Sequence, residues 1–180
     1  LVVGHREGYP MSFFHTLTHT EDDGTPLNSK IPMKQNVESW EMDHYRVYLL
    51  GHLRDHHFPQ YTNPKFVDER VEAAYDTFST LRREGRSVQV AHELAMRTLL
   101  EGLYVSRYDI LYDIVEDKLW QKFPPEYWPD FAVHLLTKKS LHDILDRYEV
   151  NGDFLVRETH QPMLDELLGE ITEILNGYGL

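Results

Sequence analysis

The chain has 180 residues, no cysteine and a formal net charge of -12, and its length suits one domain with a buried hydrophobic core. The absence of cysteine excludes disulfide bonds, thiolate catalysis and cysteine-ligated zinc sites. The acidic charge argues against direct binding of duplex DNA, whose phosphates select lysine and arginine, and apolar runs of only a few residues argue against a transmembrane helix or any membrane contact.

Residues 1–38 are predicted to form an irregular N-terminal arm, and residues 39–180 an all-helical domain. The segment HTEDDGTPLNSKIPMKQN contains turn-forming residues and prolines and has no sustained periodicity. The first residues, LVVGHREGYP, have too short an apolar run for a signal peptide, so we expect a cytoplasmic protein. We expect the arm to pack on the domain or on a second copy of the chain, with Phe13 and Phe14 as anchors.

From residue 39 onward, apolar residues recur with the periodicity of helices. We expect a first helix over 39–56, with Ser39 as its N-cap. A second begins within NPKF, where Asn63 caps the helix and Pro64 takes a first position that needs no N–H donor. Gly85 ends this helix, because glycine readily adopts the left-handed conformation that follows a helix.

The next two predicted helices meet at a short corner. A third helix is expected from its cap, Ser87, to near Gly102. The fourth begins at SRYD, where Ser106 is the N-cap and Asp109 is placed to return a hydrogen bond, as the glutamate of a capping box does. Five residues form the predicted inner face of the fourth helix: Tyr108, Leu111, Tyr112, Val115 and Leu119.

The segment KFPPEYWPDF interrupts the helical pattern, since paired prolines cannot continue a helix. Short helices are expected over 129–137 and 140–148, and a final helix over 159–176. Five aromatic residues cluster around the interruption: Trp120, Phe123, Tyr127, Trp128 and Phe131. An exposed cluster would bind a partner, whereas a buried one would lock the loop onto the core, which is the interpretation we favour.

Six or seven helices joined by short links predict an all-α protein. The helices have unequal lengths, so we expect crossed packing in a single globular orthogonal bundle and no parallel four-helix bundle. The sequence contains no glycine-rich phosphate loop and no Gly-x-Ser-x-Gly elbow. We therefore assign no catalytic residue and no cofactor.

Four histidines in HYRVYLLGHLRDHHF, residues 44–58, raise the question of a metal site. On a helix, His44 and His52 are about 12 Å apart along the axis, too far to share a metal, whereas His52 and His56 are one turn apart. The pair lacks the glutamate of a His-Glu-x-x-His zinc motif, because Leu53 follows His52. We favour packing, with one ring nitrogen hydrogen-bonded, and keep His52 and His56 as candidate metal ligands.

The stretch NPKFVDERVEAAYDTFSTLRREGRSVQVAHELAMRTLLEGLYVSRYDIL resembles a family of short uncharacterised proteins of Bacteroidetes, described as a domain of unknown function. The family hallmark is similar to Leu-x-Gly-Leu-x-x-Ser-Lys/Arg-Tyr-Asp-x-Leu, which occurs here as Leu100, Gly102, Leu103, Ser106, Arg107, Tyr108, Asp109 and Leu111. YRVYLLGHLRDHHFP and LLGEITEIL fit the same pattern, so the resemblance spans residues 44–178. It implies an accessory role beside mobile-element, helicase-like or DNA-methylase-like genes, and it carries over no catalytic residue.

These observations predict a non-enzymatic protein-interaction module in a mobile-element or DNA-processing context, with a protein partner or a second copy of the chain. The candidate interaction residues are Arg107, Asp109, Trp120 and Trp128. The alternative is a metal-dependent hydrolase in which a third histidine joins His52 and His56, the candidates being His92, His134 and His142. A third hypothesis is an acidic decoy that occupies a DNA-binding protein.

Overall fold

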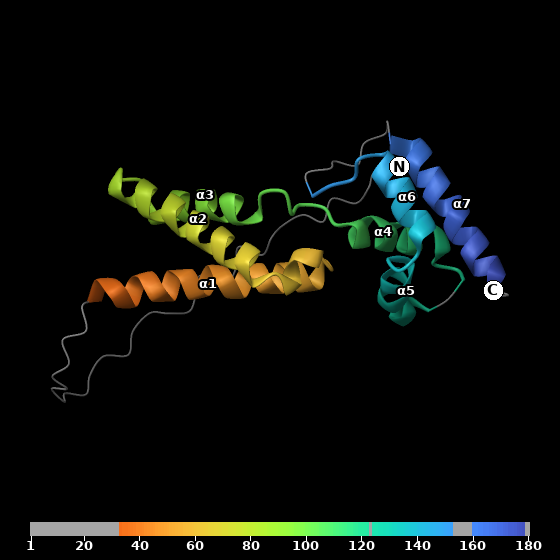
Figure 1. Cartoon of the computed structure of the whole chain (residues 1–180), viewed down its shortest axis with the longest axis horizontal. Coiled ribbons are helices and arrows are strands. Elements are labelled where there is room, and N and C mark those ends of the chain that lie inside the picture. Colours follow the sequence, from red (N-terminus) through yellow and green to blue (C-terminus); the bar gives the residue numbers. More distant parts are fainter. Residues whose placement is uncertain (1–32, 123, 153–159, 179–180) are drawn as a thin grey trace, which may run out of the picture. The chain divides into compact units, whose positions relative to one another are not determined.

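The computed structural model describes residues 33–122, 124–152 and 160–178, with side chains from residue 40 onward. In this part of the chain there are seven α-helices and no strand, which confirms the predicted all-α class (Figure 1). The helices are α1 (Met33–Asp55), α2 (Pro64–Arg83), α3 (Val88–Leu100), α4 (Arg107–Leu119), α5 (Trp128–Leu135), α6 (Lys139–Arg147) and α7 (Gln161–Gly177). Two short 3-10 helices lie in the connections, η2 (Pro59–Thr62) and η3 (Pro125–Tyr127).

The first helix begins earlier than the sequence predicted. α1 starts at Met33, so Ser39 lies inside the helix and is not its N-cap. Lys34, Gln35 and Glu38 have helix propensities close to that of alanine, which allows the helix to extend back to the residue after Pro32. Residues 33–38, which were predicted to belong to the arm, are therefore part of α1. The division of the chain by its contacts falls at the same place, after Pro32. The predicted contacts of Phe13 and Phe14 lie outside the described residues.

The predicted caps of the next three helices are confirmed. Asn63 and Ser87 each accept a hydrogen bond from the backbone amide three residues later, at the starts of α2 and α3. Gly85 follows α2 with φ +82, the left-handed conformation expected of a terminating glycine. Ser106 and Asp109 form a reciprocal capping box at the start of α4. Local sequence therefore sets where these helices begin.

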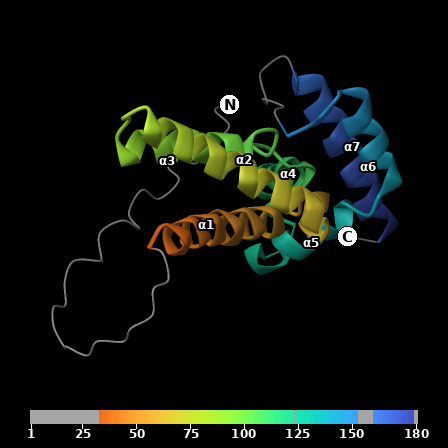
Figure 2. The same ribbon diagram turned by 60° about the vertical axis from the view of Figure 1, so that its left-hand side comes forward.

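The first of two hydrophobic cores is built by α1, α2, α3 and the residues that follow α1 and α3. α2 and α3 lie side by side and both contact α1 (Figures 1 and 2). Tyr45, Leu49 and Leu53 form the inner face of α1, and each is fully buried. The core consists of Tyr45, Leu49, Leu53, Phe58, Val67, Val71, Ala74, Ala95, Leu99, Leu100 and Leu103.

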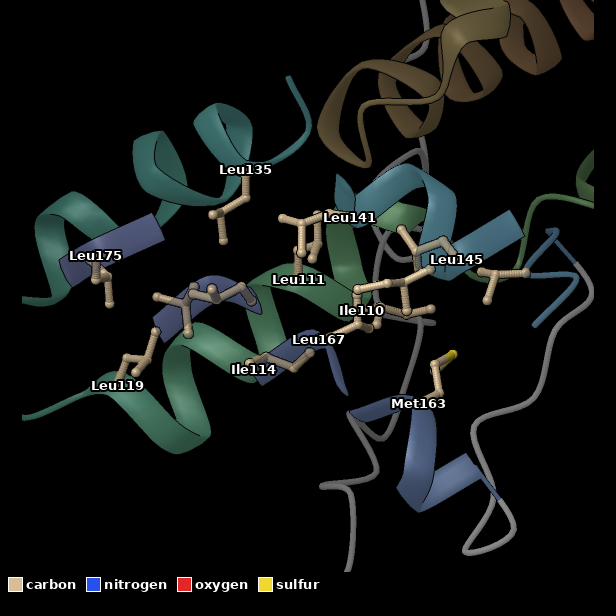
Figure 3. Close-up of a cluster of buried hydrophobic side chains, with 14 residues drawn as sticks. Ile110, Leu111, Ile114, Leu119, Leu135, Leu141, Leu145, Met163, Leu167 and Leu175 are labelled. Atoms are coloured by element: carbon tan, nitrogen blue, oxygen red, sulfur yellow. The ribbon is translucent and has the colours of Figure 1, made fainter. Parts of the chain in front are cut away.

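The second core is built by α4, α5, α6 and α7. Figure 3 shows side chains from all four helices converging, among them Leu111, Leu135, Leu141 and Leu167. α6 and α7 lie side by side. The core consists of Ile110, Leu111, Ile114, Val115, Leu119, Leu135, Leu141, Ile144, Leu145, Val150, Met163, Leu167, Ile171 and Leu175.

The predicted inner face of α4 is partly wrong. Ile110 and Ile114 are buried, whereas Tyr108 and Tyr112 are only half-buried. The two tyrosine rings lie 5.8 Å apart at the edge of the helix, where a tyrosine can bury its ring and keep its hydroxyl near water. Among the described helices, none combines the length and the apolar content that crossing a bilayer requires.

Candidate functional site

The corner between α3 and α4, residues 101–106, lies within the predicted hallmark and links the two cores. Gly102 has φ +73, a left-handed conformation that glycine adopts at no steric cost. Leu103 is buried in the first core, whereas Ile110 and Leu111 of α4 are buried in the second. The motif therefore marks the point at which the chain passes from one core to the other.

A second glycine holds the connection between α6 and α7 against this corner. The amide nitrogens of Tyr104 and Val105 donate hydrogen bonds of 2.8 and 3.1 Å to the carbonyl oxygen of Gly152. A Cβ atom on Gly152 would lie 1.5 Å from the carbonyl oxygen of Gly102. Because both groups belong to the backbone, no side chain can move to relieve this overlap. The packing therefore requires glycine at residue 152.

The candidate metal ligands face this corner from the end of α1, His52 from its last turn and His56 as the residue that follows the helix. His52 donates from Nε2 to the carbonyl oxygen of Leu103 at 2.8 Å, and its ring stacks on Phe58 with centroids 5.7 Å apart. Burial lowers the pKa of His52, which favours the neutral ring. His56 donates from Nδ1 to Oδ1 of Asp109 at 2.8 Å. Each histidine thus has the packing and the ring hydrogen bond that the sequence predicted.

Asp109 joins the capping box to α1. Its Oδ1 accepts the hydrogen bond from His56, and its Oδ2 accepts one of 3.0 Å from the amide nitrogen of Ser106. Its own amide donates to the hydroxyl of Ser106 at 3.0 Å. Burial by itself raises the pKa of Asp109, but the hydrogen bonds from His56 and Ser106 outweigh it and hold the pKa below its ordinary value. The ionised carboxylate therefore connects the two cores.

Arg107 makes a second polar connection, from α4 to α6. Its guanidinium donates to Nδ1 of His142 at 2.9 Å and forms an ion pair with Asp146. The Nε2 of His142 donates to the carbonyl oxygen of Leu136 at 2.6 Å. His142 is half-buried in this contact. The spacing of His142 and Asp146 places them on one helix face, but nothing local indicates that Arg107 lies opposite.

The other candidate metal ligands are engaged elsewhere. The Nδ1 of His92 lies 3.1 Å from the hydroxyl of Tyr45, and the Nε2 of His134 lies 2.9 Å from the hydroxyl of Tyr178. Within the residues that the structure describes, no group of three or more histidine, aspartate or glutamate side chains is placed to hold a metal ion. Each of these two histidines therefore has a hydrogen-bond partner other than His52 and His56.

Glu41 on α1 has a buried carboxylate oxygen without a hydrogen-bond partner. This oxygen is Oε2, and the residue as a whole is also buried. The Nε2 of His92 is 3.7 Å from that oxygen, too far for a hydrogen bond. Burial raises the pKa of Glu41 and lowers that of His92, so both shifts favour uncharged side chains. The sequence contained no signal for this pair, because the two residues belong to different helices.

The aromatic cluster after α4 is divided between core and surface. Trp128 and Phe131 pack against the second core, as a buried lock requires. Trp120 and Tyr127 are 58% and 57% exposed, so the lock interpretation is wrong for them. Leu119 takes the last core position of α4, and the next residue points about 100° away around the helix. Phe123 lies outside the described residues.

Comparison with known proteins agrees with the sequence resemblance. The chain matches the family model described as "Domain of unknown function (DUF1896)" over residues 37–180. It is similar to the crystal structure of protein PG0816 from Porphyromonas gingivalis, with 26% sequence identity, a TM-score of 0.73, and 79% of this chain and 96% of that chain covered. No curated protein matches. The match and the structure from a member of the Bacteroidetes confirm the expected family.

Proposed function

The chain belongs to the DUF1896 family of unknown function, and we propose that it is a non-enzymatic protein-interaction module. In this proposal it serves a cytoplasmic machine that handles mobile DNA, by binding a protein partner with a basic surface. The formal net charge of -12 supports a basic protein partner over duplex DNA. The mobile-element context is carried by the family resemblance alone.

The exposure of Trp120 and Tyr127 is the observation that carries the proposal. More than half of each side chain is exposed, on a connection that contains Pro124 and Pro125. Neighbouring Trp128 packs on the second core and anchors the connection. Exposed aromatic side chains on a well-anchored segment are the residue types that contribute most to protein interfaces. By contrast, Ser106, Arg107 and Asp109 have intramolecular hydrogen bonds or ion pairs.

A capture experiment with the full chain tests this surface. We expect that replacing both Trp120 and Tyr127 by alanine weakens binding of the captured partner at least about tenfold, because truncated aromatic anchors cost more than about 1 kcal/mol. The measurement is cross-linking capture from a lysate of the native host, followed by titration of the identified partner.

Tyr61→Ala is the matched control, because Tyr61 is 45% exposed on η2, far from this connection in sequence. The control is expected to bind like the unmodified chain. Equal binding by the double variant would remove the proposed surface. A partner without any role in DNA handling would contradict the proposed context and leave the surface supported.

The metal-dependent alternative has its own test. We expect less than stoichiometric zinc or manganese in the full chain purified without an affinity tag, because Nε2 of His52 is hydrogen-bonded to Leu103. Metal analysis by plasma mass spectrometry measures this. Stoichiometric metal that is lost in His52→Ala and kept in the control His44→Ala, whose histidine is too far along the helix to share a metal with His52, would favour the hydrolase alternative over our proposal.

A further inference from the structure

α1 has an outer surface that the first core does not use. Opposite its buried residues runs a stripe of five positions, which we call the outer stripe: Trp40, His44, Val47, Gly51 and Arg54. These positions are separated by three or four residues, so they follow one face of the helix. Trp40 is 60% exposed and Val47 73% exposed, so this face of α1 presents two large apolar side chains at the surface of the described chain. α2 and α3 contact α1 and bury its opposite face (Figure 2).

Two details of the outer stripe indicate that another helix packs on it. Gly51 lies inside a long helix, where glycine weakens the structure. A Cβ atom there would meet no described atom within 4 Å, so the contacts of the described chain do not require glycine. The ring of His44 stacks on Trp40 with centroids 5.9 Å apart, which orders two large side chains on the surface. A small residue and ordered large ones on one face are suited to close helix packing.

The outer stripe is complementary to itself. Trp40 lies seven residues before Val47 and Arg54 seven residues after it, which is about 10.5 Å along the axis in each direction. His44 and Gly51 lie about one turn before and after Val47. If a second α1 runs antiparallel with the two-fold axis near Val47, each tryptophan meets an arginine of the other copy, and each histidine meets a glycine. Arginine over a tryptophan ring is a favourable cation–π pair, and a large residue fits against a small one.

We infer that the outer stripe of α1 is the contact surface of a homodimer, in which two copies of α1 pack antiparallel around a two-fold axis near Val47. Charge supports a second copy at this place. Each copy carries a formal net charge of -12, so most surfaces of two copies repel each other. The five positions of the outer stripe contain no carboxylate, and the ion pair between Arg54 and neighbouring Asp55 adds no net negative charge to this face. The inference does not depend on the proposed binding of a protein partner through Trp120 and Tyr127.

The expected dimer is weak. A contact of one helix from each copy is smaller than a standard interface of about 1,200–2,000 Å², which is typical of weak, reversible association. Sedimentation velocity of the full chain between about 1 and 200 micromolar should show a reversible change from monomer to dimer. Val47→Glu should abolish the change, because it places two carboxylates against each other at the two-fold axis.

Val88→Glu is the matched control, since Val88 is a 50% exposed valine at the start of α3. It should dimerise like the unmodified chain, and circular dichroism should show both variants folded. A chain that stays monomeric throughout this range overturns the inference. Dimerisation that survives Val47→Glu, or that Val88→Glu also removes, overturns it as well.

Disulfide cross-linking tests the direction of packing, because the chain has no cysteine of its own. Val47→Cys should form a covalent dimer on mild oxidation, and Val88→Cys should not. In an equimolar mixture of Trp40→Cys and Arg54→Cys chains, the mixed dimer should predominate, and this dimer keeps its second Trp40–Arg54 pair intact. Predominance of dimers between two Trp40→Cys chains would show parallel packing and contradict the antiparallel arrangement.

Discussion

Gly152→Ala is expected to lower the free energy of unfolding by about 3 kcal/mol, at the upper end of the cost of overpacking. The new Cβ atom would lie 1.5 Å from the carbonyl oxygen of Gly102. Only backbone movement relieves that overlap, and such movement separates the Gly152 carbonyl from the amides of Tyr104 and Val105 that donate to it. Urea unfolding followed by circular dichroism measures the change.

Gly169→Ala is the matched control for this substitution. Gly169 lies inside α7, is exposed, and has no described atom within 4 Å of an added Cβ. Alanine is favoured over glycine inside a helix, so the free energy of unfolding of this variant should rise by about 1 kcal/mol. If Gly152→Ala lowers the free energy of unfolding and Gly169→Ala raises it, the contact at the α3–α4 corner is identified as the cause of the loss. A loss below about 1 kcal/mol for Gly152→Ala would show that the α6–α7 connection does not pack there.

Asp109→Ala is expected to lower the free energy of unfolding by about 2 kcal/mol. The substitution removes the acceptor for the amide of Ser106 in the capping box and the acceptor for the ring of His56. Loss of the cap contributes about 1 kcal/mol. The contribution of the hydrogen bond to His56 is discounted to about 1 kcal/mol, because more than a third of the His56 side chain is exposed. Denaturant unfolding at neutral pH measures the sum.

A double-mutant cycle with His56→Ala separates these two contributions. The cap is a contact within α4, whereas the bond to His56 joins α4 to α1, so a coupling energy near 1 kcal/mol is expected for the pair. Ser106→Ala serves as the control that removes the serine's side of the capping box and leaves the Asp109 carboxylate in place. A coupling energy of zero would mean that the contact between α1 and α4 adds no stability.

The loss of stability in Asp109→Ala depends on pH. The folded protein holds the pKa of Asp109 below its ordinary value. The carboxylate therefore stabilises the fold above about pH 4 and loses this effect as the pH falls through its lower folded pKa. The difference between Asp109→Ala and the unmodified chain should shrink over that acidic range. His52 and His92, whose pKa values burial lowers, destabilise both proteins as the pH falls below about 6.5.

The sequence by itself determined the helical class and most helix starts. Asn63, Ser87 and Ser106 act on amides within one helical turn, so their effect depends only on neighbouring residues. Gly85 ends α2 for an equally local reason, its positive φ. The start of α1 was placed too late because Ser39 is a plausible cap that the chain does not use. Residues 33–39 contain no proline or glycine, so nothing local stops the helix from extending past Ser39 toward its N-terminus.

Tertiary structure alone decided the polar connections and the division of the aromatic cluster. His56 meets Asp109 across 53 positions and Arg107 meets His142 across 35, and no local pattern encodes a pairing at such separation. Whether Trp120 or Trp128 reaches the core depends on how α4 ends relative to α5. Periodicity reports which face of a helix is apolar, but the partner of that face is set by long-range packing.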